Sequence, residues 1–218
     1  MLDELINNNY KFTNNMLNKI KTMDDVFDFF RVLLAYDAER DFYAKYFPSI
    51  LEDESITRFR PMKKWDIPNV LTIEERVYEF PWNKRTFLDC MRIGYHCLVL
   101  ERAGTILAYG ILCPGFEESH IMNICVAPKF HGRGYGRKMM ERLIEIAHED
   151  GSEKMLLEVR PSNLSALRLY ENMGFKQVGV RKGYYPAREG REDAILCTLE
   201  LVEQTEGKGD ESGDKLNQ

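Results

Sequence analysis

The sequence predicts a mixed α/β fold between about residues 56 and 202. Short apolar runs typical of strands alternate there with amphipathic runs at helical spacing, and a glycine-rich turn joins one run of each kind. The chain has 218 residues, of which 44% are hydrophobic, so it can bury a sizeable core. We expect three parts: a helical extension over residues 1–55, the α/β domain over 56–202 and a disordered tail over 203–218.

The two outer parts have simpler patterns than the α/β domain. An apolar stripe at helical spacing marks the extension and consists of Val26, Phe27, Phe30, Leu33 and Leu34. Such a stripe more often packs against another surface than binds a ligand, and the role of the extension stays open. Residues 203–218 are charged and glycine-rich and lack apolar periodicity, which predicts disorder.

The first half of the α/β domain is expected to hold four strands and one helix. The strands are predicted at Ile56–Arg60, His96–Glu101, Thr105–Cys113 and Ser119–Ala127, and the helix at Lys64–Tyr78. Gly104 separates the second and third strands and predicts a hairpin turn. Pro128 then ends the fourth strand.

The second half repeats the alternation of helix and strand. Helices are predicted at Arg137–His148 and Asn163–Asn172, and strands at Lys154–Val159, Phe175–Arg181 and Asp193–Leu201. Gly174 stops the second helix. The last two strands are expected to pair antiparallel around a long loop, Lys182–Glu192, which carries Tyr184 and Tyr185. A loop of this length is often functional.

Charge and cysteine usage exclude several classes of protein. The formal net charge of −5 argues against general nucleic-acid binding, which needs a basic face. The five cysteines are scattered through apolar runs, which indicates reduced core thiols in a cytoplasmic protein. We find no metal-ligand spacing, no signal peptide and no apolar run long enough to cross a membrane, so we expect neither a metal nor a membrane partner.

The glycine-rich segment His131–Gly136 is the first candidate site. It follows an apolar strand and precedes an amphipathic helix, the order in which backbone N–H groups and the helix dipole bind a phosphate. It lacks the Gly-Lys-Ser/Thr of a Walker loop, and its spacing does not fit a dinucleotide fingerprint. Taken alone, it is equally compatible with a tight turn between strand and helix.

From Ile121 onward the chain resembles the GCN5-related N-acetyltransferases (GNAT), whose signature Gln/Arg-x-x-Gly-x-Gly/Ala opens a helix. Here His131 stands at the first position of the signature. Further segments look like the ribosomal-protein-alanine N-acetyltransferases: Phe80–Trp82, Leu157–Asn163, Leu169–Phe175, Tyr184–Pro186 and Gly190–Ala194. The resemblance implies the GNAT fold, a mostly antiparallel mixed sheet with splayed middle strands flanked by helices, and acetyl-coenzyme A as cosubstrate.

The resemblance also implies a role for individual residues. Backbone groups of Ile124, Cys125 and Val126 would hold the acetyl-pantetheine arm. The pyrophosphate would lie against the turn formed by Gly132, Arg133, Gly134, Tyr135, Gly136 and Arg137. Asn163 would touch the cofactor, Glu158 would act as the general base, and Tyr170 as the general acid.

Each of these residues also has a purely structural interpretation. Glu158 can be a solvent-facing strand carboxylate, although its run Met155–Val159 otherwise looks buried. Asn163 can be a helix N-cap, Tyr170 a core aromatic, and Cys125 a small buried strand residue. The resemblance favours function most clearly at Glu158 and Tyr170.

The chemistry favours an α-amine as acceptor. The nucleophile must be neutral, and an α-amino group has an ordinary pKa of roughly 7.7–8.0, against about 10.4 for lysine. We therefore expect acetyl transfer to the N-terminal amine, by resemblance the alanine of a small-subunit ribosomal protein. The alternatives are transfer to a lysine, polyamine or antibiotic, or a cofactor-binding module that regulates a partner without turnover; the oligomeric state stays open.

Overall fold

The computed structural model describes residues 57–201. The extension predicted for residues 1–55 and the tail predicted for 203–218 lie outside this range, and the three-part division stays a prediction. The strands are β1 (Thr57–Pro61), β2 (His96–Arg102), β3 (Thr105–Cys113), β4 (Glu118–Val126), β5 (Lys154–Val159), β6 (Lys176–Pro186) and β7 (Arg191–Glu200). The helices are α4 (Ile67–Val77), α5 (Lys84–Ile93), α6 (Tyr135–Glu149) and α7 (Leu164–Glu171), with short 3₁₀ turns at Lys64–Asp66 and Pro128–Phe130.

The seven strands follow the order β1-β2-β3-β4-β5-β7-β6, and the pairs β1–β2, β2–β3, β5–β7 and β6–β7 are antiparallel. This confirms the predicted mixed, mostly antiparallel fold with flanking helices, while the splay of the middle strands stays a prediction. The chain divides into two compact units. The first holds the described residues up to Cys113 together with Ile121–Leu143, and the second holds Pro114–His120 and the described residues from Ile144 onward.

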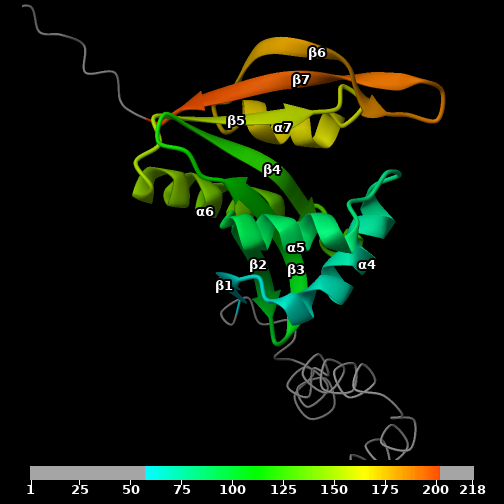
Figure 1. Cartoon of the computed structure of the whole chain (residues 1–218), viewed down its shortest axis with the longest axis vertical. Coiled ribbons are helices and arrows are strands. Elements are labelled where there is room, and N and C mark those ends of the chain that lie inside the picture. Colours follow the sequence, from blue (N-terminus) through cyan, green and yellow to red (C-terminus); the bar gives the residue numbers. More distant parts are fainter. Residues whose placement is uncertain (1–56, 202–218) are drawn as a thin grey trace, which may run out of the picture. The chain divides into compact units, whose positions relative to one another are not determined.

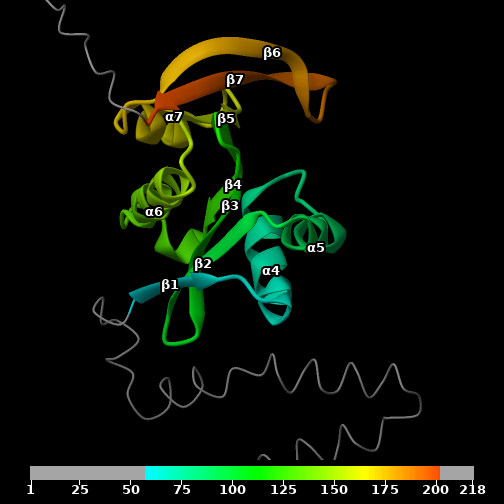
Figure 2. The same cartoon turned by 60° about the vertical axis from the view of Figure 1, so that its left-hand side comes forward.

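In the first unit, helices cover both faces of β3 (Figures 1 and 2). Tyr109 points to one face, where its ring meets that of Phe87 of α5 edge-on at 5.7 Å between centroids. Gly110 points to the other, where an added Cβ would lie only 3.0 Å from Met139 and Leu143 of α6. Neighbouring residues of a strand alternate between faces, so α5 and α6 pack on opposite sides of β3. The glycine is required because α6 approaches the strand so closely.

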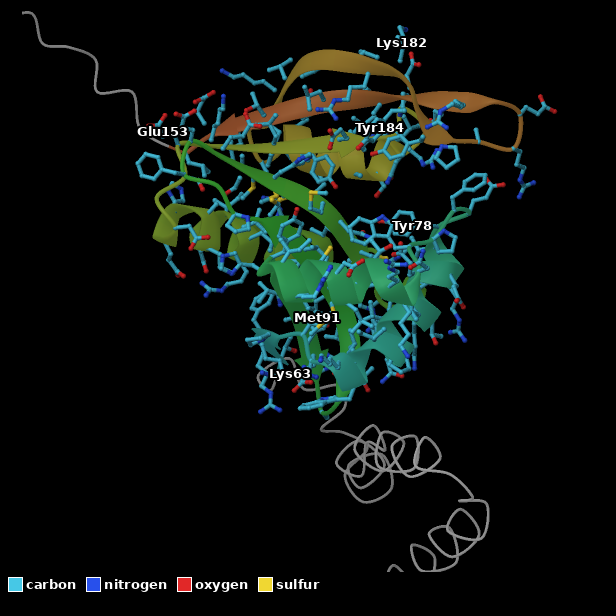
Figure 3. The ribbon with its side chains drawn as sticks, viewed as in Figure 1. Lys63, Tyr78, Met91, Glu153, Lys182 and Tyr184 are labelled. Atoms are coloured by element: carbon cyan, nitrogen blue, oxygen red, sulfur yellow. The ribbon has the colours of Figure 1, made fainter. Side chains whose placement is uncertain are left out.

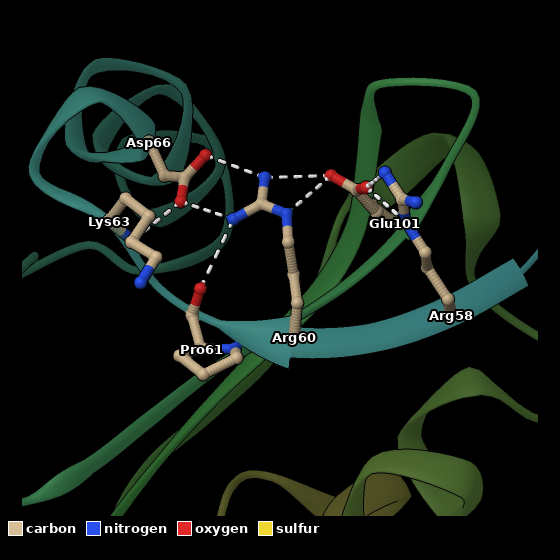
Figure 4. Close-up of polar contacts among 6 residues, drawn as sticks. All are labelled: Arg58, Arg60, Pro61, Lys63, Asp66 and Glu101. Atoms are coloured by element: carbon tan, nitrogen blue, oxygen red, sulfur yellow. Dashed lines mark hydrogen bonds and ion pairs between the residues drawn. The ribbon is translucent and has the colours of Figure 1, made fainter.

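An ionic cluster joins β1 to β2 and to the turn before α4 in the first unit (Figure 4). Arg60 pairs with Asp66 at 2.6 Å and with Glu101 at 2.7 Å, and both carboxylates are buried. Arg58 reaches Glu101 as well, at 2.6 Å, but its side chain is 63% exposed. The hydrogen bond to Asp66, partly opposed by burial, raises the pKa of Arg60 above its ordinary value. Arg60 is therefore the cation that the two buried carboxylates share.

In the second unit, β7 lies between β5 and β6. Glu158 of β5 stands opposite Leu196 of β7, and Gly179 of β6 stands opposite the same leucine. Helix α7 accompanies these strands (Figure 1), and Gly174, just after it, comes close to Leu199 of β7. Gly174 has a positive φ of 90°, as predicted for a residue that stops a helix.

Two sequence predictions were wrong. Helix α5 was not predicted, although Asn83 caps it by accepting from Thr86 N–H at 3.1 Å and Gly94 ends it with a φ of 98°. The segment Lys182–Glu192 is not one long loop, because β6 continues to Pro186 and β7 begins at Arg191. The register of β6 against β7 shifts between Arg181 and Tyr185. There a side chain takes the place of a backbone partner, because the carboxylate of Asp193 accepts a hydrogen bond from Gly183 N–H at 2.8 Å.

Candidate active site

The glycine-rich turn presents its backbone openly. After β4, a 3₁₀ turn ends at Phe130, residues 131–134 are exposed, and α6 starts at Tyr135, two residues earlier than predicted. Gly132 and Gly134 have φ values of 73° and 80°, and a Cβ built on either would meet nothing within 4 Å. Both glycines thus have left-handed backbone conformations, which glycine adopts without strain, and the space beside them is open.

Cations surround this turn. Arg133 and Lys129 both lie over the Phe130 ring, at 5.8 and 5.9 Å from its centroid, and Lys138 lies 5.4 Å from the Tyr135 ring. The N-terminus of α6 adds its unpaired N–H groups and the positive end of its dipole. These residues fit a diphosphate, because bare backbone, helix dipole and positive side chains gather at one turn.

Two side chains of the turn have structural roles. The Tyr135 side chain is only 1% exposed, and its hydroxyl accepts from Arg102 Nη1 at 3.3 Å, so Tyr135 can offer a ligand only its backbone. His131, which departs from the family signature, donates from Nε2 to the Val126 carbonyl at 2.8 Å. This bond fastens the turn to the end of β4.

The three β4 residues proposed for the pantetheine arm are held by further contacts. The Tyr78 hydroxyl donates to the Ile124 carbonyl at 2.9 Å, and Figure 3 shows Tyr78 after α4. Cys125 is 3% exposed, and burial raises the pKa of its thiol to about 12. A thiol with such a pKa stays protonated at neutral pH, so Cys125 is a buried strand residue rather than a nucleophile.

A buried carboxylate that the sequence analysis missed lies behind this strand. Glu74 of α4 is 1% exposed and accepts from Trp82 N–H at 2.9 Å, from the Tyr109 hydroxyl and from Asn123 Nδ2 at 3.3 Å. Burial raises its pKa, and these hydrogen bonds oppose the rise. Glu74 thereby connects α4, the segment that follows it, β3 and β4. Only its place in an apolar helix face could have signalled it.

In the second unit, Glu158 lies on β5 between the side chains of His120 and Arg181. Its side chain is 6% exposed; Oε2 contacts His120 Nε2, and Oε1 lies 2.8 Å from Arg181 Nη1. Burial alone would raise the pKa of Glu158, but the hydrogen bond and charge of His120 and the charge of Arg181 outweigh it and lower the pKa. Glu158 is consequently an ionised, partnered carboxylate rather than a solvent-facing one. His120 and Arg181 were not predicted as its partners.

Tyr170 occupies the buried face of α7. The residue is 7% exposed, and its ring packs against that of Phe175 at 5.8 Å between centroids. Burial, followed by the charges of Tyr185 and Cys197, raises the pKa of the phenol. The phenol therefore carries its proton at neutral pH, as a general acid must. Its packing also matches the structural interpretation as a core aromatic.

Asn163 is the N-cap of α7. Its side-chain oxygen accepts from Ala166 N–H at 3.2 Å. This confirms the N-cap interpretation, which leaves a contact with the cofactor as a prediction.

The β6–β7 hairpin is fastened to the end of β5. Arg160 donates to the Pro186 carbonyl at 3.1 Å, pairs with Glu192 at 2.8 Å, and lies 4.3 Å from the centroid of the Tyr185 ring. Tyr184 is 39% exposed, and Figure 3 shows it on the same hairpin. The residues that the resemblance assigned thus fall into two sets: the turn and β4 in the first unit, and Glu158, Asn163 and Tyr170 in the second.

Comparison with known proteins decides the family. The sequence model of the acetyltransferase (GNAT) family matches residues 67–175. The chain belongs to this family. GNAT enzymes use acetyl-coenzyme A, so the chain is an acetyltransferase with this acetyl donor.

Named relatives lie within this family. The ribosomal protein bS18-alanine N-acetyltransferase of Escherichia coli is 37% identical over 136 residues, 62% of this chain and 92% of that protein. The enzyme of the same name from Haemophilus ducreyi is 34% identical over 137 residues, 62% of this chain and 94% of that protein.

Solved structures agree with this placement. The crystal structure of the Escherichia coli ribosomal-protein-S18-alanine N-acetyltransferase has a TM-score of 0.64 and 34% identity, and the match covers 69% of this chain and 97% of that chain. Ard1 from Thermoplasma volcanium, with 22% identity and a TM-score of 0.63, shares the fold. Within residues 57–201, no helix is long and apolar enough to cross a membrane.

Proposed function

We propose that the protein transfers acetyl from acetyl-coenzyme A to the α-amino group of the N-terminal alanine of a small-subunit ribosomal protein. The observation that carries the proposal is the 37% identity to the Escherichia coli bS18-alanine enzyme along 92% of that enzyme's length. A likeness over almost the whole relative extends well beyond the cofactor turn. We place the activity in the cytoplasm, since all five cysteines are free thiols.

The donor side of the reaction uses the glycine-rich turn. Acetyl-coenzyme A supplies an activated acetyl thioester. Residues 132–137 would hold its diphosphate through backbone N–H groups, the helix dipole and nearby cations. The β4 residues Ile124, Cys125 and Val126 would hold the pantetheine arm by their backbone, and Asn163 would touch the cofactor as well as cap α7.

The acceptor side needs a proton removed and a proton returned. Glu158 supplies the carboxylate on which removal of the amine proton depends, because its contacts with His120 and Arg181 lower its pKa and keep it ionised. Tyr170 returns a proton to the departing thiolate, since its raised pKa keeps the phenol protonated until then. No enzyme nucleophile takes part, and Cys125 stays a thiol.

Peptide acetylation by the purified chain tests the proposal. We expect acetylation of a peptide beginning with alanine, located by mass spectrometry on the α-amine and not on an internal lysine. Glu158→Gln and Tyr170→Phe should each lower kcat by about 100-fold, the usual contribution of an acid or base. Tyr184→Phe, which removes the same hydroxyl from an exposed tyrosine, is the matched control for stability and acetyl-coenzyme A binding.

The outcomes separate the alternatives. Acetylation of lysine, polyamine or antibiotic in preference to the alanine peptide would replace the proposed acceptor and leave the chemistry intact. Full rates in both Glu158→Gln and Tyr170→Phe would remove the acid–base assignment. Binding of acetyl-coenzyme A without transfer to any amine would indicate a regulatory module.

A further inference from the structure

His120 contacts the proposed base, although neither the glycine-rich turn nor the acid–base pair requires it. It lies on β4, and its Nε2 is hydrogen-bonded to Glu158 Oε2. The side chain of His120 is 26% exposed, whereas that of Glu158 is 6% exposed. The pair therefore has one buried member and one that solvent can reach.

The ion pair on the other oxygen of Glu158 sets the direction of this hydrogen bond. Arg181 lies 2.8 Å from Oε1, and Glu158 is ionised at neutral pH. An ionised carboxylate only accepts hydrogen bonds, so a neutral His120 must donate from Nε2. Its Nδ1 then carries the lone pair, and no hydrogen bond within residues 57–201 uses that nitrogen.

The imidazole is the better proton acceptor of the two. A base works best when it titrates near the working pH, and imidazole is the side chain whose ordinary range does so. Glu158 does not meet this condition, because its pKa is lowered, Oε2 contacts His120, and Oε1 is buried beside the guanidinium of Arg181 without a hydrogen bond of its own. A carboxylate next to an imidazole instead orients the ring and stabilises the imidazolium.

We propose that His120 is a further catalytic residue, whose Nδ1 takes the proton from the acceptor amine while Glu158 holds the ring. This rests on the acetyl transfer proposed above. The protonated amine gives one proton to Nδ1, and the neutral nitrogen then forms the C–N bond to the acetyl carbon. The C–S bond breaks, its electron pair goes to sulfur, and Tyr170 protonates the thiolate. The second proton of the nitrogen and that of His120 pass to water, and Tyr170 regains one from water.

Groups from three strands surround the His120–Glu158 pair. Glu158 faces His120 from β5, and Arg181 and Tyr185 approach Glu158 from β6. Burial, and then the charge of Glu158, raises the pKa of the Tyr185 phenol, and arginine stays charged at any working pH.

The test is a kinetic comparison in the full chain, with the amine that the wild type acetylates fastest from a panel of alanine peptide, lysine peptide and polyamine. His120→Gln keeps a donor for Glu158 but cannot take a proton. We expect its kcat to fall by about 100-fold, with the acidic limb of the pH profile lost and the KM for acetyl-coenzyme A little changed. His120→Ala should regain activity in proportion to added neutral imidazole. His148→Gln, at an exposed histidine of α6, is the matched control and should behave as the wild type.

A wild-type kcat and pH profile in His120→Gln, beside an inactive Glu158→Gln, would overturn this proposal and leave the acetyltransferase function standing. A wild type that acetylates no amine of the panel would refute the proposed function instead. Nitrogen-15 NMR of the full chain gives a readout that does not depend on turnover. The Nε2–H tautomer of His120 supports the proposal, and the Nδ1–H tautomer contradicts it.

Discussion

Glu74 accepts a hydrogen bond from the backbone N–H of Trp82 at 2.9 Å, which ties the segment after α4 to a buried carboxylate. The same carboxylate accepts from the Tyr109 hydroxyl of β3 and from Asn123 of β4. A single side chain thus satisfies polar groups from three elements of the first unit. Because this bond fixes the backbone of the Phe80–Trp82 segment, that segment depends on a residue that has no contact with solvent.

Removing this carboxylate should destabilise the protein. Glu74→Ala leaves several buried donors without a partner, and we expect a loss of about 3 kcal/mol in the free energy of unfolding. Glu74→Gln still offers an acceptor to Trp82 N–H and should lose only about 1 kcal/mol. Urea unfolding followed by circular dichroism measures both. Equal urea midpoints for Glu74→Ala and the wild type would show that the network contributes nothing.

Arg60 and Arg58 should differ sharply although both pair with Glu101. Arg60→Ala leaves the buried Asp66 and Glu101 without their shared cation, which should cost about 3 kcal/mol of unfolding free energy. Arg58 is 63% exposed, so Arg58→Ala should cost at most about 1 kcal/mol. Thermal unfolding of the two variants checks this order, and a larger loss for Arg58→Ala would contradict it.

Gly134 should be more important for the cofactor than for folding. Alanine disfavours its φ of 80°, so Gly134→Ala should rearrange the turn and raise the Kd for acetyl-coenzyme A by about 10-fold. Gly190 has a similar φ of 77° and equally open space for a Cβ, but lies in the β6–β7 turn. Gly190→Ala is therefore the control for strain alone. Isothermal titration calorimetry that gives the two variants the same Kd would argue against the turn as the diphosphate site.

Glu158 should contribute to stability at neutral pH and not in acid. Its pKa is lowered in the folded protein, so the ionised form stabilises the fold above the ordinary pKa of glutamate. This contribution is lost as the pH falls through the lowered pKa. Urea unfolding of the wild type and of Glu158→Gln from pH 7 to pH 3 should show the difference between them shrinking toward acid. A difference that grows toward acid would mean that the pKa is raised.

Local patterns predicted most strands of the described region. The Gly104 hairpin and the glycine-rich turn before α6 depend on residues adjacent in sequence, and both are confirmed. Helix α5 was missed because charged residues interrupt its sequence and only Phe87 and Cys90 of its residues are buried. Its capping residues, Asn83 and Gly94, were the feature of the sequence that indicated a helix. The end of β6 was not predicted because its glycine and proline are typical of a loop. In the structure, the side chains of Arg191 and Asp193 on β7 form hydrogen bonds with the backbone of this part of β6.

The polar partners of the site residues could not be predicted from the sequence, for a different reason. His120 and Glu158 are 38 positions apart, and Glu74 and Asn123 are 49 apart. Such pairs depend on strand register and on helix placement, which local patterns do not determine. Resemblance supplied Glu158 and Tyr170, but the relationships that decide how Glu158 ionises became visible only in three dimensions.

The contacts of Arg160 limit how this enzyme can be re-engineered. Its guanidinium joins the strand that carries Glu158 to Pro186 and Glu192 of the neighbouring hairpin. A chimera that took only the hairpin tip from a related acetyltransferase would leave Arg160 without its contacts to Pro186 and Glu192. Exchanging the tip together with Arg160 and Glu192 would keep these contacts, so these residues are the smallest unit of the hairpin that can be exchanged without losing them.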